Sequence, residues 1–159
     1  MAVTVKLDSS EYYMAMQSGC MRQVQNRSIG RPHYYGAPTD RAEQFHINGS
    51  VGEACVAKHL GKYWLGTGTF GGSDVEKYEV RSTSRPDGDL ILHDYDKDDR
   101  PYISVYVSEG VGVIRGWLLG KEGKKKEFWR DPAKGRPAYF VPTSRLRPID
   151  TLSQYKVTG

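Results

Sequence analysis

Residues 41–60 read RAEQFHINGSVGEACVAKHL, and this stretch decides the first element of the expected fold. Three apolar residues follow Glu53 at spacings of three, four and seven: Val56, Ala57 and Leu60. These spacings place Glu53 on the apolar face of a helix. A carboxylate on such a face predicts a paired cation or metal, because an isolated buried charge is costly.

Two glycines and a histidine bear on where this helix begins and on which residues share the face of Glu53. Gly49 and Gly52 weaken it, so they indicate either close approach of another backbone or a helix that begins only near Ser50. His46 precedes Glu53 by seven residues and would share its face in a continuous helix. Two alternatives remain for His46: a partner of the Glu53 site, or a buried histidine with its own hydrogen bonds.

Residues 78–83, YEVRST, are rich in β-branched and aromatic side chains, and the turn signal SRPDG follows them at 84–88. This composition predicts a strand. Alternation along a strand puts Glu79 and Arg81 on one face and directs Val80 into apolar packing on the other.

Asp74 lies five residues before Glu79 and therefore has the opposite parity. A turn or bulge between the two is needed if both carboxylates face one site. Lys77 shares the parity of Glu79 and could add an ammonium group there. Carboxylate oxygens suit Mg²⁺, and a neighbouring cation can neutralise charge on a phosphate.

At these residues the chain resembles the PD-(D/E)XK nuclease superfamily, in particular its small phage-type members. The matching segments are GSVGEA at 49–54, Asp74, and EVR at 79–81, with further likeness at 114–117 and 137–142. The resemblance implies an α/β (α+β) fold with a central mixed β-sheet flanked by helices and a restriction-endonuclease-like core. Residues 1–40 would form an N-terminal helix and loop extension, and 41–159 the nuclease core of a single domain.

The resemblance also implies the site. Glu53, Asp74, Glu79 and Arg81 would be catalytic. Glu53, Asp74, Glu79 and the carbonyl of Val80 would bind Mg²⁺, for which Mn²⁺ can substitute. Arg81 stands where the family usually has Lys, and arginine does not readily give or take a proton. An ordinary exposed Glu79–Arg81 ion pair on a strand, or a decayed site, are the alternatives.

Composition is compatible with a nucleic-acid partner. The chain has 159 residues, a net charge of +4 and a pI near 9.0, as expected for one domain that binds a polyanion. We expect six basic residues to contact DNA: Arg31, Lys77, Lys124, Lys125, Lys126 and Arg130. Solvated charge next to core aromatics explains the same pattern equally well, and Trp117 and Trp129 are expected in the core.

No apolar run is long enough to cross a bilayer, and the N-terminal residues lack signal-peptide character. Cys20 and Cys55 do not form a disulfide framework. We therefore expect no membrane partner and a cytoplasmic location, which would be the infected host cell if a phage encodes the chain. The histidines and cysteines show no spacing typical of a zinc site.

The remaining chain predicts a helix over 10–25, capped by Ser9 or Ser10, and then a loop over 27–40. Successive strands are predicted at 89–93, 102–107, 111–117 and 139–141, with a helix start at 148–152. The acidic segment 94–99 lacks the EF-hand pattern and predicts a solvated hairpin turn.

These observations together favour a metal-dependent DNA nuclease. The sequence does not decide whether the substrate is DNA or RNA, or whether it is duplex or single-stranded. It also leaves open endonuclease or exonuclease action, and a homodimer or a monomer. Two alternatives come from other classes: an inactive nucleic-acid-binding module of the same fold, and a phage structural or interaction protein.

Overall fold

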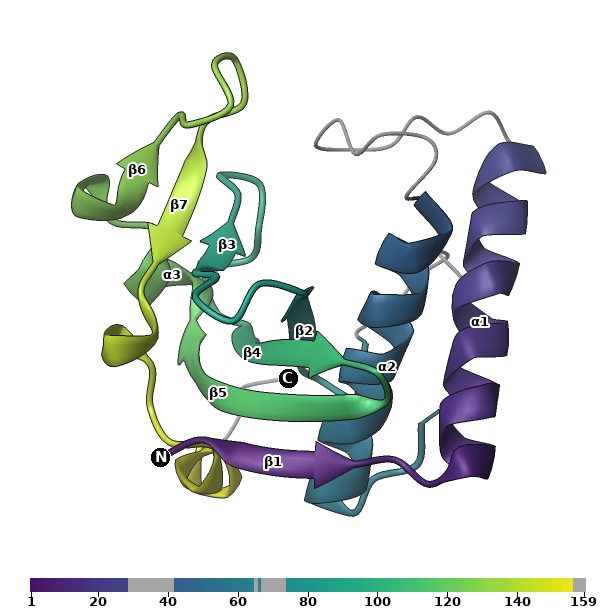
Figure 1. Cartoon of the computed structure of the whole chain (residues 1–159). Coiled ribbons are helices and arrows are strands. Elements are labelled where there is room, and N and C mark those ends of the chain that lie inside the picture. The colour runs from purple at the N-terminus through teal and green to yellow at the C-terminus, as the bar shows by residue number, and fades with distance from the viewer. Residues whose placement is uncertain (29–41, 65, 67–73, 156–159) are drawn as a thin grey trace.

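The computed structural model describes residues 1–28, 42–64, 66 and 74–155. Two N-terminal helices pack on a mixed four-stranded sheet, and a small antiparallel sheet lies beyond it (Figure 1). The helices are α1 (Ser9–Ser28) and α2 (Ala42–Leu60). The large sheet has the order β1-β5-β4-β2, formed by β1 (Val3–Lys6), β2 (Glu79–Thr83), β4 (Pro101–Ser108) and β5 (Val111–Leu119).

Strands β2 and β4 pair in parallel, whereas β1–β5 and β4–β5 are antiparallel. The small sheet has the order β3-β7-β6, formed by β3 (Leu90–Leu92), β6 (Trp129–Arg130) and β7 (Ala138–Val141). Short helical turns complete the chain: α3 (Gly120–Gly123), η3 (Lys126–Phe128), η4 (Thr143–Arg145) and η5 (Ile149–Gln154).

The predicted α/β class is confirmed, but the arrangement differs from a run of hairpins in one sheet. The strand predicted at 89–93 joins β7 in the small sheet, while 101–108 joins the large one. Segment 94–99 therefore connects two sheets, and the prediction of a hairpin turn is wrong. Strand β1 was not predicted from the sequence; its four residues pair with β5 and make the N-terminus part of the large sheet.

Two apolar clusters hold these layers together. The larger lies between the helices and the large sheet and includes Val56, Ile103 and Trp117, so the prediction of a core position for Trp117 is confirmed. The smaller joins the opposite face to the small sheet, through Leu90, Leu92, Tyr102, Leu118, Phe128 and Val141. Trp129, predicted as core, is instead 41% exposed and packs edge-on against Tyr139.

Asp8, rather than Ser9 or Ser10, caps helix α1. Its carboxylate accepts a hydrogen bond from the Glu11 N–H at 2.8 Å, and the Glu11 carboxylate accepts one from the Asp8 N–H at 2.8 Å. This reciprocal capping box satisfies two backbone donors at the helix start. The predicted helix over 10–25 is confirmed and extends from Ser9 to Ser28.

Close contacts between packed elements explain two of the glycines. A Cβ at Gly52 would lie 1.9 Å from the Ser82 Oγ, so Gly52 allows α2 to approach β2. The close approach predicted from the sequence therefore exists, but it is made by a side chain and not by another backbone. Helix α2 begins at Ala42 rather than near Ser50. At Gly19 of α1, a Cβ would lie 2.6 Å from the Cα of Ile47 on α2. The two helices therefore cross with backbone contact at Gly19.

We expect Gly19→Ala to lower the free energy of unfolding by about 1–3 kcal/mol, because the helices must separate to admit the methyl group. Urea denaturation followed by circular dichroism measures the change. Gly49→Ala is the matched control: a Cβ there meets nothing within 4 Å, and replacing a helical glycine should stabilise the protein by up to ~1 kcal/mol. A stable Gly19→Ala protein would contradict the close crossing.

Within the described residues, no helix combines the length and apolar character needed to span a bilayer. Both cysteines are free thiols; Cys20 is exposed, and Cys55 is buried under the sheet with its Sγ near the Val5 carbonyl. Burial raises the pKa of the Cys55 thiol to about 11. Cys55 is therefore an uncharged core side chain at neutral pH.

Candidate functional site

Strand β2 forms one edge of the large sheet and determines the orientation of the candidate residues. Val80 is buried in the larger cluster, and Ser82 contacts α2 at Gly52. Glu79 and Arg81 have the opposite parity and line a cavity on the other face, as the alternation predicted.

A tight turn separates Asp74 from this strand, which confirms the predicted interruption. Val75 and Tyr78 exchange two backbone hydrogen bonds, at 3.1 and 2.8 Å, and Glu76 within the turn has a positive φ of 49°. The turn brings the Asp74 Oδ2 back to accept a hydrogen bond from the Val80 N–H at 2.8 Å. Lys77 is exposed in the same turn, so strand parity does not apply to it.

The three candidate carboxylates interact electrostatically, with Asp74 between the other two. Burial and the charge of Glu53 raise the pKa of Asp74 to about 6, although hydrogen bonds from Val80 and Glu79 oppose the shift. Burial and the charge of Asp74 also raise the pKa of Glu79, against the pull of Arg100. Asp74 and Glu79 lie within hydrogen-bonding reach of each other. Partly buried carboxylates that interact in this way favour a bound proton or cation.

The cation expected beside Glu53 is an arginine from the neighbouring helix. Arg22 of α1 donates to both carboxylate oxygens, at 2.9 and 2.5 Å, and the Trp64 Nε1 donates to Oε2 at 3.2 Å. The side chains are only 13% exposed for Arg22 and 6% for Glu53. Both oxygens of Glu53 thus already accept hydrogen bonds within the protein.

Glu79 and Arg81 each pair with a residue far along the chain rather than with each other. The Arg100 Nη1 lies 2.7 Å from the Glu79 Oε1, and the Arg81 Nη2 lies 2.7 Å from the Asp96 Oδ1. Asp96 belongs to the acidic segment 94–99 and is buried, with its Oδ2 accepting the His93 N–H at 2.8 Å. The sequence expectation of a solvated turn is therefore wrong at Asp96.

These ion pairs line a polar cavity of about 300 Å³. Its walls come from β2, from the start of β4 and from segment 94–99: Glu79, Arg81, Tyr95, Asp96, Lys97, Arg100 and Tyr102. The Arg81 guanidinium lies over the Tyr102 ring at 5.2 Å from its centroid. The cavity joins the Asp74–Glu79 pair through Glu79.

The carboxylates at this site could supply part of the ligand shell of a divalent cation, but not all of it. No group of three or more histidine, cysteine, aspartate or glutamate side chains in the described residues is gathered closely enough to hold a metal alone. Mg²⁺ does not need such a cage, because it usually takes one or two carboxylates and completes its shell with water and phosphate. Asp74 and Glu79, with raised pKa values and mutual contact, supply a pair of that kind.

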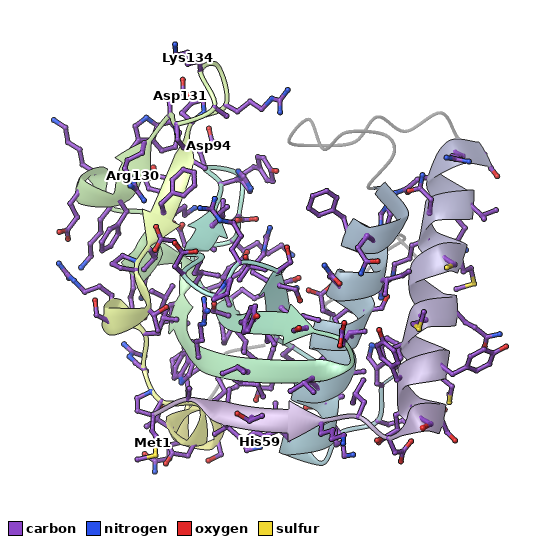
Figure 2. The ribbon with its side chains drawn as sticks, viewed as in Figure 1. Met1, His59, Asp94, Arg130, Asp131 and Lys134 are labelled. Atoms are coloured by element: carbon purple, nitrogen blue, oxygen red, sulfur yellow. The ribbon has the colours of Figure 1, made fainter. Side chains whose placement is uncertain are left out.

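The described basic residues that were predicted to contact DNA lie on different segments of the chain. Arg31 lies outside the described residues, and Lys125 and Lys126 are exposed. Lys124 is tied to segment 94–99: it pairs with Asp98 and donates to the Asp96 carbonyl at 2.6 Å. Arg130 pairs with Asp89 at 2.8 Å and lies at the end of the molecule formed by β6 and β7 (Figure 2). Of the predicted DNA-contacting residues that the structure describes, none lines the cavity.

His46 lies on α2 and contacts α1, where its Nε2 is 3.2 Å from the Asn26 Nδ2. Sequence reasoning missed four partners of the site: Arg22, Trp64, Asp96 and Arg100. Arg22 falls within the helix predicted over 10–25, but no spacing in the sequence indicates that it pairs with Glu53. Arg100 reaches Glu79 only because β2 and β4 run parallel in the register Glu79↔Tyr102.

No protein-family model, no curated protein and no solved structure shows a significant match to this chain.

Proposed function

We propose that the chain is a metal-dependent deoxyribonuclease with a PD-(D/E)XK-like site, in which Asp74 and Glu79 hold Mg²⁺ or Mn²⁺. The observation that carries the proposal is the Asp74–Glu79 carboxyl pair beside a cavity lined with arginines. Burial raises the pKa of both groups, helped by the charge of Glu53 at Asp74 and by the charge of Asp74 at Glu79. Perturbed carboxyls in a polar cavity are typical of functional sites. The order of helix, Asp74 and Glu-x-Arg strand adds support from the resemblance.

The local fold is compatible with a restriction-endonuclease-like core. Helix α2 packs on β2 through Gly52 and Ser82, and β2 pairs in parallel with β4 within a mixed sheet. The edge position of β2 leaves the turn bearing Asp74 at the margin of the sheet. Of the carboxyl pair, Glu79 lines the cavity, so a substrate in the cavity would reach the pair through Glu79.

Each residue then has a separate role. Asp74 and Glu79 supply carboxylate oxygens, and the Val80 N–H fixes the orientation of the Asp74 carboxylate. A bound metal would lower the pKa of a coordinated water and polarise the phosphate. Arg81 keeps its positive charge at every physiological pH and neutralises charge that develops on the phosphate.

Glu53 has a different role from the one the resemblance implies. Both of its oxygens are engaged by Arg22 and Trp64, so we assign it to the support of the site rather than to the metal. Its charge raises the pKa of Asp74 and thereby favours cation binding there.

Cleavage assays with labelled linear duplex, circular single-stranded and branched DNA in Mg²⁺ or Mn²⁺ test the proposal. We expect cutting that EDTA abolishes and that Glu79→Gln lowers by ~10³-fold, because a ligand contributes several kcal/mol to the transition state. Glu127→Gln is the matched control: Glu127 is exposed and pairs with Arg145, away from the cavity residues. Full activity of Glu79→Gln would contradict the site.

One observation favours a second candidate, an inactive nucleic-acid-binding module. Arg81 occupies the family lysine position and is held at 2.7 Å by the buried Asp96, so it does not take part in proton transfer. A protein that binds DNA and Mg²⁺ but cuts no substrate would favour this module over the nuclease.

A further inference from the structure

We propose that the cavity beside Glu79 binds one unpaired nucleotide of single-stranded DNA, with Lys97 and Arg81 at its phosphate and Tyr95 against its base. The inference rests on the proposed nuclease function and names its substrate class. It is carried by the shape and charge of the cavity and by the exposed ring at its rim.

The cavity is built on a fixed framework. Tyr102, only 2% exposed, lies beneath the Arg81 guanidinium. The Tyr102 hydroxyl also accepts the Lys97 N–H at 3.0 Å, and Asp96 accepts the His93 N–H. Segment 94–99 is thus anchored at two points, to β4 and to His93 directly after β3. The backbone of this segment is held in place before any ligand binds, which limits the entropy cost of binding.

The charges in the cavity favour an anion. Arg81 is balanced by Asp96, and Arg100 by Glu79. Lys97 also lines the cavity, is exposed, and forms no ion pair with any residue that the structure describes. Among the residues that line the cavity, Lys97 therefore leaves one positive charge in excess. Phosphate oxygens are the ligands that lysine and arginine side chains bind most readily in nucleic acids.

Tyr95 supplies an aromatic surface next to these charges. Its side chain is 64% exposed, and its ring stacks on His93 with centroids 5.2 Å apart and planes inclined by 11°. An aromatic ring with such exposure next to cationic side chains is typical of a platform for a nucleic-acid base. Cation and platform come from the same segment, two residues apart.

The size of the cavity selects the form of the nucleic acid. Its volume of about 300 Å³ is at the lower end of the range for small-ligand sites, which suits one nucleotide rather than a duplex. Bases in a duplex are paired and stacked, so only an unpaired base can reach a ring at the cavity rim. We therefore expect single-stranded DNA to bind more tightly than duplex.

Fluorescence anisotropy with labelled oligothymidylate, a matched duplex and matched oligouridylate tests this proposal in EDTA, where no strand is cut. Tyr95→Ala should weaken binding of the single strand by about 5- to 150-fold, the range for loss of one stacked base. Lys97→Ala should weaken it and reduce the salt dependence by about one phosphate contact. Both residues are exposed, so the variants should fold, which circular dichroism checks.

Matched controls share the residue types but lie elsewhere. Tyr13→Ala removes a 62% exposed tyrosine from α1, and Lys6→Ala removes an exposed lysine from β1, at the opposite edge of the large sheet from β2. We expect both controls to bind oligothymidylate like the wild-type protein.

Equal affinity for duplex and single strand, or binding by Tyr95→Ala at the level of Tyr13→Ala, would overturn the assignment of the cavity. Tighter binding of oligouridylate than of oligothymidylate would overturn the choice of DNA. The proposed nuclease fails separately: no cutting by a wild-type protein that shows the expected binding pattern would remove the enzyme and leave the cavity. If the wild-type protein cuts DNA but Tyr95→Ala and Lys97→Ala bind the single strand as tightly as the wild type, the nuclease stands and the assignment of the cavity fails.

Discussion

Asp74→Asn is expected to lower metal-dependent cleavage by ~10³-fold or more and, at the same time, to stabilise the protein. Asp74 ionises with a pKa of about 6 in the folded protein, against an ordinary value of 3.8. The folded protein therefore holds the proton more tightly than the unfolded chain, and ionisation destabilises it. This contribution to stability is complete below pH 3.8 and is lost as the pH rises through about 6.

The amide in Asp74→Asn removes the charge, so the gain in stability should exist at neutral pH and disappear in acid. The raised pKa sets an upper limit of ~3 kcal/mol, and we expect about 1–3 kcal/mol because the carboxylate also accepts the Val80 N–H. Urea denaturation at about pH 8 and about pH 4 measures the difference. Equal stability of variant and wild type at both pH values would show that Asp74 carries no electrostatic strain.

Two results would separate catalysis from stability. A stabilised Asp74→Asn protein without cleavage activity identifies a carboxylate kept for function at a cost in stability. A stabilised variant that still cuts DNA would contradict the assignment of Asp74 as a metal ligand, while the electrostatic interpretation would stand. Asp150→Asn, at an exposed carboxylate of η5, is the control and should change neither property.

Arg22→Leu is expected to cost about 3–5 kcal/mol of stability, because it leaves the Glu53 carboxylate buried without its cation. The pair is well placed for such an effect: both guanidinium donors reach the carboxylate, and little of either side chain is exposed. The pair also joins α1 to α2 beside the site. Chemical denaturation of the purified variant measures the loss.

The double variant Arg22→Leu with Glu53→Leu completes the test. Replacing both members of a buried pair with apolar groups is often neutral, so the double variant should recover most of the lost stability. Recovery would define Glu53 as half of a structural ion pair. If Glu53→Leu alone were stable, and Mg²⁺ affinity fell in that variant, Glu53 would instead be a ligand as the family resemblance implies.

Several local features were predictable because they depend on neighbours in sequence. Alternation at 79–81 separated Glu79 and Arg81 from Val80, and the reversed parity of Asp74 indicated a turn that the structure contains. Gly52 was expected to allow a close approach, and Ser82 provides it. Turn chemistry and side-chain periodicity act over a few residues, so a single sequence is sufficient to read them.

The same local rules were insufficient where partners are distant. Segment 94–99 has the composition of a solvated turn, yet its connection between two sheets buries Asp96 against Arg81. Trp129 is a large apolar residue of the kind expected in a core, yet it lies on β6, an exposed edge strand of the small sheet. Both outcomes depend on which sheet a strand joins, and neighbouring residues do not specify that choice.

The sequence by itself determined the α/β class, the helix that carries Glu53 and the alternating strand that carries Glu79, because each follows from a short-range period. Only the tertiary structure decided that Glu53 pairs with Arg22, Glu79 with Arg100, and Arg81 with Asp96. These pairs span 31, 21 and 15 positions in the chain. Helix crossing and parallel strand register bring them together, and burial at the same place is the largest cause of the raised pKa values of Asp74 and Glu79.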